Sequence, residues 1–293
     1  MKRLINVKPV NKLPDSLLES FVVPPFSTLD TRQGYWQDRK KMWNKYLGDT
    51  GATRDGEFGR TYNITKQGLH KQTSMFDPVL AELMYKWFCP KNGKVLDPFG
   101  GEQTKGIVAG LMNLQYTGIE LREEQVAVNN EQSKQYDNVR YICGDSTKLD
   151  ILIEDEDFDF LITSPPYFNL EEYSNKKADL SRESYENFLD GLGKIFAHCY
   201  WMLKKDSFIV VKLGDVRDNK GEMIGLVPDF INLMKDLGFK YYNEIILINQ
   251  SGSAALRAAG NMKSRKVVKC HQNVLVFYKG DISHIKTKFE QLR

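Results

Sequence analysis

From Lys94 onward, short apolar segments alternate regularly with segments that have the periodicity of helices. Apolar runs bounded by glycine or polar residues are typical of buried strands, and the 3.6-residue period between them indicates helices. This alternation predicts an α/β fold with a mostly parallel, seven-stranded sheet that carries helices on both faces. The expected strands lie at 95–97, 116–121, 139–143, 158–164, 207–214, 241–248 and 273–279, and the expected helices at 104–112, 123–135, 183–203 and 227–237.

Residues 1–72 differ from this regular part. They contain four prolines, a stretch rich in aromatic and basic residues from Tyr35 to Tyr46, and the glycine-bearing run GDTGATRDGEFG. Prolines and glycines at this density interrupt regular helices and strands. We therefore expect an N-terminal extension at 1–72, one large domain at 73–280 and a C-terminal tail at 281–293.

The composition narrows the class of protein. The 293 residues are 41% hydrophobic and 27% charged, as in an ordinary globular chain, and a net charge of +3 is too small for a polybasic protein. Four cysteines without a CxxC pair favour free thiols, so no metal site is expected. No apolar run has the length of a signal peptide or a membrane span, which predicts a cytoplasmic protein without a membrane partner.

Three acidic residues follow three consecutive expected strands. Asp97 is followed by Pro98-Phe99-Gly100-Gly101, whose glycines let the backbone approach a ligand closely. Glu120 stands 23 positions later, a spacing at which a carboxylate accepts hydrogen bonds from ribose hydroxyls, and Asp145-Ser146 follows the third strand. Singly, each is more often a turn or a helix cap. Together they predict a nucleoside pocket.

The position of Asp97 favours one kind of nucleoside. A carboxylate directly before the glycines would repel a pyrophosphate, but it suits the cationic amine of a methionine moiety. No GK[ST] sequence follows the glycines, which argues against a P-loop.

The most specific motif is Thr163-Ser164-Pro165-Pro166-Tyr167, at the end of the fourth expected strand. Two prolines make a rigid turn whose carbonyls remain acceptors. An amino nitrogen on a base is a poor nucleophile, because its lone pair is delocalised into the ring. Two acceptors that hold its hydrogens, Ser164 Oγ and the Pro165 carbonyl, would direct the lone pair out of the ring plane, and Tyr167 would supply an aromatic face for a flipped base.

These motifs, in this order, resemble those of the amino-group (cytosine-N4 or adenine-N6) DNA methyltransferases of bacteria and phages, over about residues 70–280. Phe76-Asp77-Pro78 looks like the cofactor-contacting helix start of that family. Residues 269–280 and the stretch PPFSTLDTRQGYWQDRKKMW are similar to a phage and mobile-element branch. The chain departs from the family at Gly101-Glu102-Gln103, where many relatives have Gly-Ser-Gly, and it carries no large insertion that could read a DNA sequence.

The resemblance implies a Rossmann-like class I methyltransferase fold, S-adenosylmethionine as cofactor and methylation of double-stranded DNA in a bacterial cell or a phage-infected host. A serine at the first motif position favours cytosine over adenine. A cognate restriction nuclease and a homodimer remain open as partners. The implied catalytic residues are Ser164, Pro165, Pro166 and Tyr167, and the implied cofactor-binding residues are Phe76, Asp77, Asp97, Pro98, Phe99, Gly100, Gly101, Glu120, Asp145 and Ser146.

Two further features bear on DNA. A basic loop before the last strand has no acidic residue from 251 to 271, which suits phosphate contacts, although a solvated loop is the alternative. Its predicted DNA-binding residues are Arg257, Lys263, Arg265, Lys266 and Lys269. The helix with Trp36 and Trp43 could also read DNA, but their seven-residue spacing favours a packed face.

Other functions remain as alternatives. Methylation at a base carbon needs a cysteine near Ser164, and Cys143 and Cys199 are interpreted as buried strand and helix residues, which excludes that chemistry. Methylation of RNA or of a protein glutamine could use a similar turn. A catalytically silent DNA-binding relative is the third alternative, indicated only by Glu102-Gln103.

Overall fold

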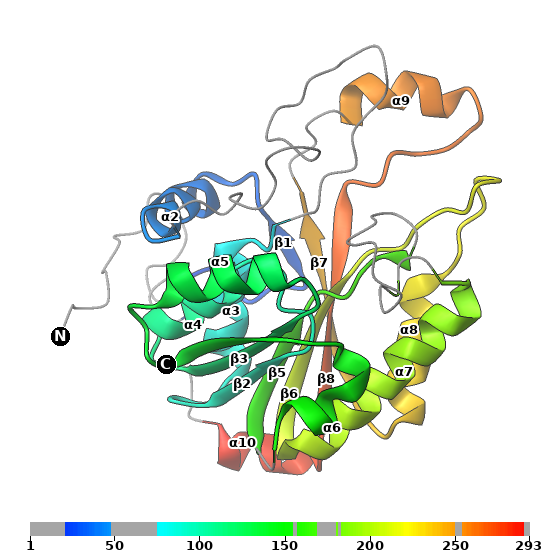
Figure 1. Cartoon of the computed structure of the whole chain (residues 1–293). Coiled ribbons are helices and arrows are strands. Elements are labelled where there is room, and N and C mark those ends of the chain that lie inside the picture. The colour runs from blue at the N-terminus through cyan, green and yellow to red at the C-terminus, as the bar shows by residue number, and fades with distance from the viewer. Residues whose placement is uncertain are drawn as a thin grey trace.

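The computed structural model describes residues 21–47, 75–154, 157–168, 180, 183–249 and 254–289. These residues form one eight-stranded sheet in the order β1-β7-β8-β6-β5-β2-β3-β4 (Figure 1). Neighbouring strands are parallel, except that β8 runs antiparallel to β6 and β7. The strands are β1 (Thr28–Asp30), β2 (Lys94–Asp97), β3 (Gln115–Glu120), β4 (Val139–Cys143), β5 (Phe158–Thr163), β6 (Leu203–Leu213), β7 (Lys240–Ile248) and β8 (His271–Lys279).

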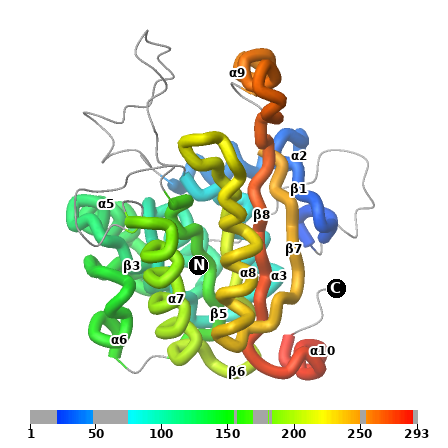
Figure 2. Tube along the Cα trace, turned by 90° about the vertical axis from the view of Figure 1, so that its right-hand side faces the viewer, coloured from blue at the N-terminus to red at the C-terminus, as the bar shows by residue number. Residues whose placement is uncertain are grey.

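Helices cover both faces of the sheet, which confirms the expected α/β, Rossmann-like fold class. Alternation along β6 separates the two apolar layers: Phe208 and Val210 belong to one, and Ile209 and Val211 to the other. The first layer lies under α2 (Gly34–Asn44), α3 (Pro78–Phe88), α4 (Thr104–Leu111) and α5 (Glu123–Ser133), and the second under α6 (Leu149–Leu152), α7 (Tyr185–Met202) and α8 (Leu226–Asp236). Figure 2 shows α7 and α8 side by side in front of the sheet.

Local sequence signals explain where several of these helices begin and end. Asp77 accepts a hydrogen bond from the backbone of Val79 (2.9 Å), and Pro78 occupies the first turn, so α3 begins there. Ser184 caps α7 through the backbone of Asn187. Gly238, with φ of 96°, follows α8 in a conformation that favours glycine. The expected boundaries agree within about two residues, except that β6 begins at Leu203 rather than at 207.

The N-terminal extension adds a strand that the seven-stranded prediction lacked. β1 pairs in parallel with the end of β7 and makes the edge of the sheet. This pairing joins Asp30 to Ile248, far apart in sequence, and a strand of three residues carries no readable alternation of its own.

Helix α2 of the same extension packs on α3. Trp36 and Trp43 are buried, which confirms the packed-face interpretation of their spacing. The indole nitrogen of Trp43 donates to Glu82 (2.8 Å), and Arg39 forms a two-pronged ion pair with the same carboxylate. Lys40 pairs with Asp77 at 2.8 Å. The described part of the extension is therefore anchored to the large domain.

The strand order reverses between β2 and β5. From β2 the chain proceeds to β3 and β4 on one side, and it returns at β5 on the other side. The carboxyl ends of β2 and β5 therefore flank a topological switch point, with Asp97 at the end of one strand and Thr163 at the end of the other. Open α/β sheets bind their ligands at such a point.

One helix stands apart from the sheet. α9 (Ala254–Met262) lies between β7 and β8 in the chain and projects beyond the carboxyl edge of the sheet in both views (Figures 1 and 2). The tail forms η4 (Ile282–His284) and α10 (Ile285–Lys288), whose Ile285 packs on the core. The run GDTGATRDGEFG and residues 250–253 of the basic loop lie outside the described residues.

Candidate active site

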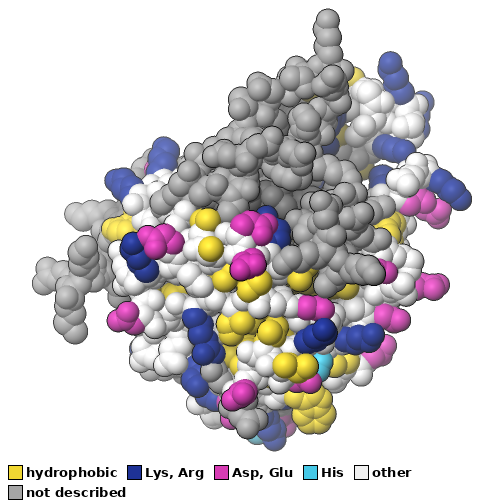
Figure 3. All heavy atoms as spheres, viewed as in Figure 1, with side chains coloured by type: hydrophobic (Ala, Val, Ile, Leu, Met, Phe, Trp, Pro, Cys, Tyr) yellow, Lys and Arg dark blue, Asp and Glu magenta, His cyan; other side chains and the backbone are white. Residues whose placement is uncertain are grey.

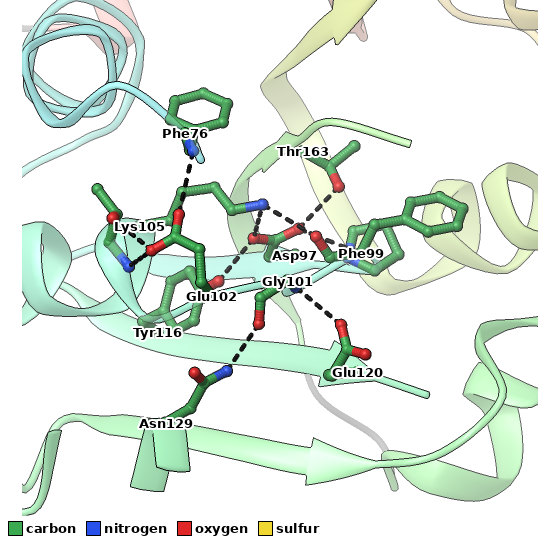
Figure 4. Close-up of polar contacts among 12 residues, drawn as sticks. Phe76, Asp97, Phe99, Gly101, Glu102, Lys105, Tyr116, Glu120, Asn129 and Thr163 are labelled. Atoms are coloured by element: carbon green, nitrogen blue, oxygen red, sulfur yellow. Dashed lines mark hydrogen bonds and ion pairs between the residues drawn. The ribbon is translucent and has the colours of Figure 1, made fainter. Parts of the chain in front are cut away.

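Asp97 is the centre of a buried polar cluster at the switch point (Figure 4). Its carboxylate accepts hydrogen bonds from Tyr116 Oη (2.6 Å), Thr163 Oγ1 (2.7 Å) and the backbone nitrogen of Phe99 (3.2 Å), and it lies 2.6 Å from Lys105 Nζ. Burial raises the pKa of Tyr116 well above its ordinary value, and the charge of Asp97 adds to the rise, so this phenol remains a donor. Asp97 thus joins the carboxyl ends of β2 and β5 to Tyr116, which lies near the start of β3.

Lys105 is the partner that sequence reasoning missed. Its ammonium group also donates to the carbonyl of Phe99 (2.9 Å) and lies 5.3 Å from the ring centre of Phe76. Lys212 Nζ lies 5.0 Å from the same ring. The sequence does carry a signal for it: Lys105 stands in the mostly apolar helix TKGIVAGL, so it is expected to be buried, and a buried lysine requires a partner of opposite charge.

The glycine loop passes close to β3. The nitrogen of Gly100 donates to the carbonyl of Ile119 (2.6 Å), and a Cβ at Gly100 would lie 3.1 Å from that oxygen. Gly101 has φ of 58°, and its carbonyl accepts from Asn129 Nδ2 (2.8 Å). Its nitrogen donates to Glu120 Oε2 (3.1 Å). The backbone path therefore favours glycine at both positions, independently of any ligand.

Glu120 and Asp145 lie at the same edge as Asp97, as expected. Glu120 Oε1 accepts from the backbone and side chain of Arg122 at 3.0 and 3.1 Å. Asp145 Oδ1 caps η1 (Ser146–Lys148) through Thr147. Ser146 Oγ donates to the carbonyl of Pro98 (2.5 Å), which ties the segment after β4 to the glycine loop.

Asp77 and Phe76, both assigned to the cofactor, lie in different surroundings. Asp77 uses Oδ1 to cap α3, and its Oδ2 accepts from Lys40 and from the indole of Trp36 (3.4 Å), so its carboxylate lies on the α2 side. Phe76, by contrast, places its ring against Lys105 and Lys212 in the buried cluster.

The departure at Glu102-Gln103 has a structural explanation. Glu102 is buried, and it accepts hydrogen bonds from the backbone of Phe76 (3.0 Å) and of Thr104 (2.8 Å). One carboxylate therefore connects the start of α3 with the start of α4. Gln103 donates to the carbonyl of Leu47 (3.2 Å) and so holds the extension. Both residues fasten surrounding elements together.

The Ser164-Pro165-Pro166-Tyr167 turn follows β5 directly. Pro165 and Tyr167 are buried, and Ser164 and Pro166 are half-buried. Ser164 Oγ lies 3.4 Å from Tyr167 Oη, and Gln272 Nε2 donates to that phenol at 2.9 Å. The turn thus presents the serine and tyrosine hydroxyls together at the switch point.

The five residues predicted to bind DNA differ in their exposure. Arg257, Lys263 and Arg265 are exposed on the arm, which we define as residues 254–268. Figure 3 shows Lys and Arg side chains gathered there, at the upper right. Lys266 is half-buried beside Gly221, and Lys269 is half-buried too. Burial lowers the pKa of Lys269, whereas the charge of Asp215 acts in the opposite direction.

The interpretation of Cys143 as a buried strand residue is wrong. This cysteine is exposed, because β4 is the edge strand and Cys143 is its last residue, whereas Cys199 is buried as expected. Among the described residues, no group of histidine, cysteine and acidic side chains could hold a metal ion. No helix in the described ranges is long and apolar enough to cross a membrane.

Comparison with known proteins finds similarity over a little less than half of the chain. The family model described as DNA methylase (N6_N4_Mtase) matches residues 158–292. The type II methyltransferase M.MjaVI of Methanocaldococcus jannaschii is 27% identical over 134 residues, which are 45% of this chain and 66% of M.MjaVI. M.BglII of Bacillus subtilis, also named a type II methyltransferase, is 27% identical over 136 residues, which are 46% of this chain and 34% of M.BglII. The matched segments thus span less than two thirds of both relatives.

Solved structures with a similar arrangement share little sequence. TrmN from Thermus thermophilus has a TM-score of 0.48 and 16% identity, with 70% of this chain and 49% of TrmN covered. A methyltransferase from Pyrococcus furiosus has a TM-score of 0.47 and 16% identity, with 83% of this chain and all of that chain covered (100%).

Proposed function

We propose that this chain belongs to the amino-group DNA methyltransferase family and methylates the exocyclic amino group of a base in double-stranded DNA. The observation that carries the proposal is the place of the Ser164–Tyr167 turn. It stands at the topological switch point, beside the edge that also holds Asp97 and Glu120. Ligand site and reacting groups thus converge at the position where an open α/β sheet binds its ligands.

The residues at this edge fit S-adenosylmethionine. The loop at Gly100 and Gly101 has no side chain and lies against β3, which leaves backbone for a ligand to approach. Glu120 and Asp145 bring carboxylates to neighbouring strand ends, where they can accept from ribose hydroxyls and an adenine amino group. The proposed holding residues are Phe76, Pro98, Phe99, Gly100, Gly101, Glu120, Asp145 and Ser146. When bound, the cofactor supplies an electrophilic methyl group on a sulfonium.

Asp97 has a different role in this proposal from the direct amine contact expected from sequence. Its carboxylate is fully buried and already has Lys105, Tyr116 and Thr163 as partners. It therefore acts as a positioning residue that fixes the glycine loop relative to β5. Asp77 likewise acts through α3, which it caps.

The chain's own groups activate the amino nitrogen. Ser164 Oγ and the Pro165 carbonyl accept the two amino hydrogens, which directs the nitrogen lone pair out of the ring plane. Tyr167 supplies an aromatic face for the flipped base. Because Pro165 and Tyr167 are buried, the turn is held before the base arrives, so little reorganisation is needed.

Cytosine is the preferred base in this proposal, with adenine as the alternative, since the motif begins with serine. The projecting arm gives the DNA a basic surface through Arg257, Lys263 and Arg265. The hydrogen bonds of Glu102 and Gln103 give both residues a structural reason to be present, which supports an active enzyme over a silent relative.

Long-read sequencing of DNA from cells that express the chain tests the proposal. We expect N4-methylcytosine, or else N6-methyladenine, in a defined sequence context, and no modification in cells that express Ser164→Ala. Unmodified DNA from cells with abundant folded wild-type protein, together with methyl transfer to RNA or protein in extracts, would overturn it.

A further inference from the structure

A polar contact connects β8 to the Ser164–Tyr167 turn. Gln272 Nε2 donates to Tyr167 Oη at 2.9 Å, and the same oxygen lies 3.4 Å from Ser164 Oγ. Gln272 comes 105 residues after Tyr167 in sequence, so the contact is a product of the fold. Gln272 lies within residues 269–280, which resemble the phage and mobile-element branch, but the sequence assigned it no role at the reacting centre.

The sheet explains how a β8 side chain reaches the turn. Gln272 is the second residue of β8 and pairs with Leu247 of β7. β6 lies between β8 and β5, but it ends at Leu213. The next residue, Gly214, carries no side chain, and a Cβ there would lie 3.5 Å from Tyr167 Cε2. The tyrosine ring therefore lies over the end of β6, and its hydroxyl meets the amide of Gln272.

We propose that Gln272 is a positioning residue for methyl transfer, acting on Ser164 through the hydroxyl of Tyr167. The amide of Gln272 donates to the phenol oxygen and occupies one of its lone pairs, which favours the arrangement in which the phenol donates to Ser164 Oγ. The serine oxygen then keeps its second lone pair for the amino group. This role rests on the proposed function, because it names the residue that orients the proposed amino-group acceptor.

The alternative is that the hydrogen bond of Gln272 has only a structural role at the start of β8 and no effect on methyl transfer. A double-mutant cycle separates the two, because a residue that acts only through the Tyr167 hydroxyl loses its effect when that hydroxyl is absent. The variants are Gln272→Leu, Tyr167→Phe and the combination. Gln115→Leu is the matched control, since Gln115 is exposed on β3.

Turnover and cofactor affinity are measured together, with tritiated methyl incorporation into plasmid DNA and calorimetric titration with S-adenosylhomocysteine. We expect Gln272→Leu to lower kcat about tenfold while Kd for S-adenosylhomocysteine stays within about twofold. In the Tyr167→Phe background, the same substitution should have no further effect. Gln115→Leu should match the wild type.

An NMR measurement that does not depend on turnover completes the test. With 13C-labelled tyrosine, the Cζ resonance of Tyr167, assigned by its loss in Tyr167→Phe, should shift in Gln272→Leu and stay in place in Gln115→Leu. An unshifted resonance overturns the contact, and full kcat or multiplicative effects in the cycle overturn the role. An inactive wild type with a shifted resonance overturns the proposed function instead, and with it this role.

Discussion

The carboxylate of Asp97 lies 2.6 Å from the ammonium nitrogen of Lys105, and both side chains are buried at the end of β2. A buried charge that loses its partner typically costs about 3–5 kcal/mol, because its desolvation is no longer compensated. We therefore expect Lys105→Met to lower the free energy of unfolding by about that amount. Adding Asp97→Asn should recover part of the loss. Urea denaturation followed by circular dichroism makes the comparison, and equal midpoints for Lys105→Met and wild type would contradict this account of the cluster.

Glu120 should contribute directly to cofactor affinity. A charge-assisted hydrogen bond is worth about 1.5–3 kcal/mol, so Glu120→Ala should weaken the binding of S-adenosylmethionine by about 10- to 150-fold. Glu124→Gln, on the exposed side of α5, removes the same charge and should change nothing. Calorimetric titration of both folded variants is the measurement. Unchanged affinity in Glu120→Ala would refute the assignment of the ribose site.

The cofactor affinity of Asp97→Ala should fall as well, for a different reason. This substitution leaves the glycine loop without its link to Thr163 and Lys105. We expect Asp97→Ala to lower thermal stability more than Glu120→Ala does, because Asp97 is fully buried and Glu120 is only half-buried, while both variants bind the cofactor more weakly. Melting curves recorded beside the titrations distinguish these two patterns. A stable Asp97→Ala protein that binds weakly would favour the direct amine contact.

The arm should provide the salt-dependent part of DNA binding. Replacing Arg257, Lys263 and Arg265 with glutamine should reduce the slope of log K against log salt by about 2.7, since each phosphate contact contributes about 0.9. The control replaces Lys134, Lys235 and Lys286, exposed lysines outside the arm, with the same loss of charge. Fluorescence anisotropy at several salt concentrations measures the slope. An equal reduction in both variants would assign the effect to net charge rather than to the arm.

The extension should be part of the stable core. Trp36 is fully buried, and removing a buried tryptophan side chain costs about 3–5 kcal/mol. Trp36→Ala should therefore lower the free energy of unfolding by that order, whereas Trp201→Ala should have little effect, because Trp201 is 79% exposed. Chemical denaturation compares the two variants. A small effect for Trp36→Ala would mean that the packing of the extension contributes little to the stability of the large domain.

The sequence predicted that Asp97, Glu120 and Asp145 lie at one edge of the sheet. Only the strand positions had to be correct for this prediction, because parallel strands bring their carboxyl ends to the same edge. Contacts between segments far apart in the sequence could not be predicted from local patterns. The pairing of β1 with β7 joins two segments that share no pattern. Gln272 reaches Tyr167 because β6 ends at Leu213, and no local sequence signal predicts that end.

Burial of charge was equally hard to foresee. Lys105 stands in a helix whose apolar neighbours predict a core, and its pairing with Asp97 depends on the loop geometry between them. Cys143 ends a strand with apolar residues, yet its exposure follows from the place of β4 at the sheet edge. Such properties are set by the order of strands, which alternation along the chain does not encode.

The most direct test of the account is methyl transfer by Ser164→Ala. Ser164 is proposed to hold the amino group in the transition state and not to contribute to resting cofactor affinity. Tritiated methyl incorporation into duplex DNA should therefore fall about 100- to 1,000-fold, while the calorimetric affinity for S-adenosylmethionine stays close to that of the wild type. Ser283→Ala, an exposed serine of η4, should retain full activity. Near wild-type turnover by Ser164→Ala would contradict the proposed mechanism.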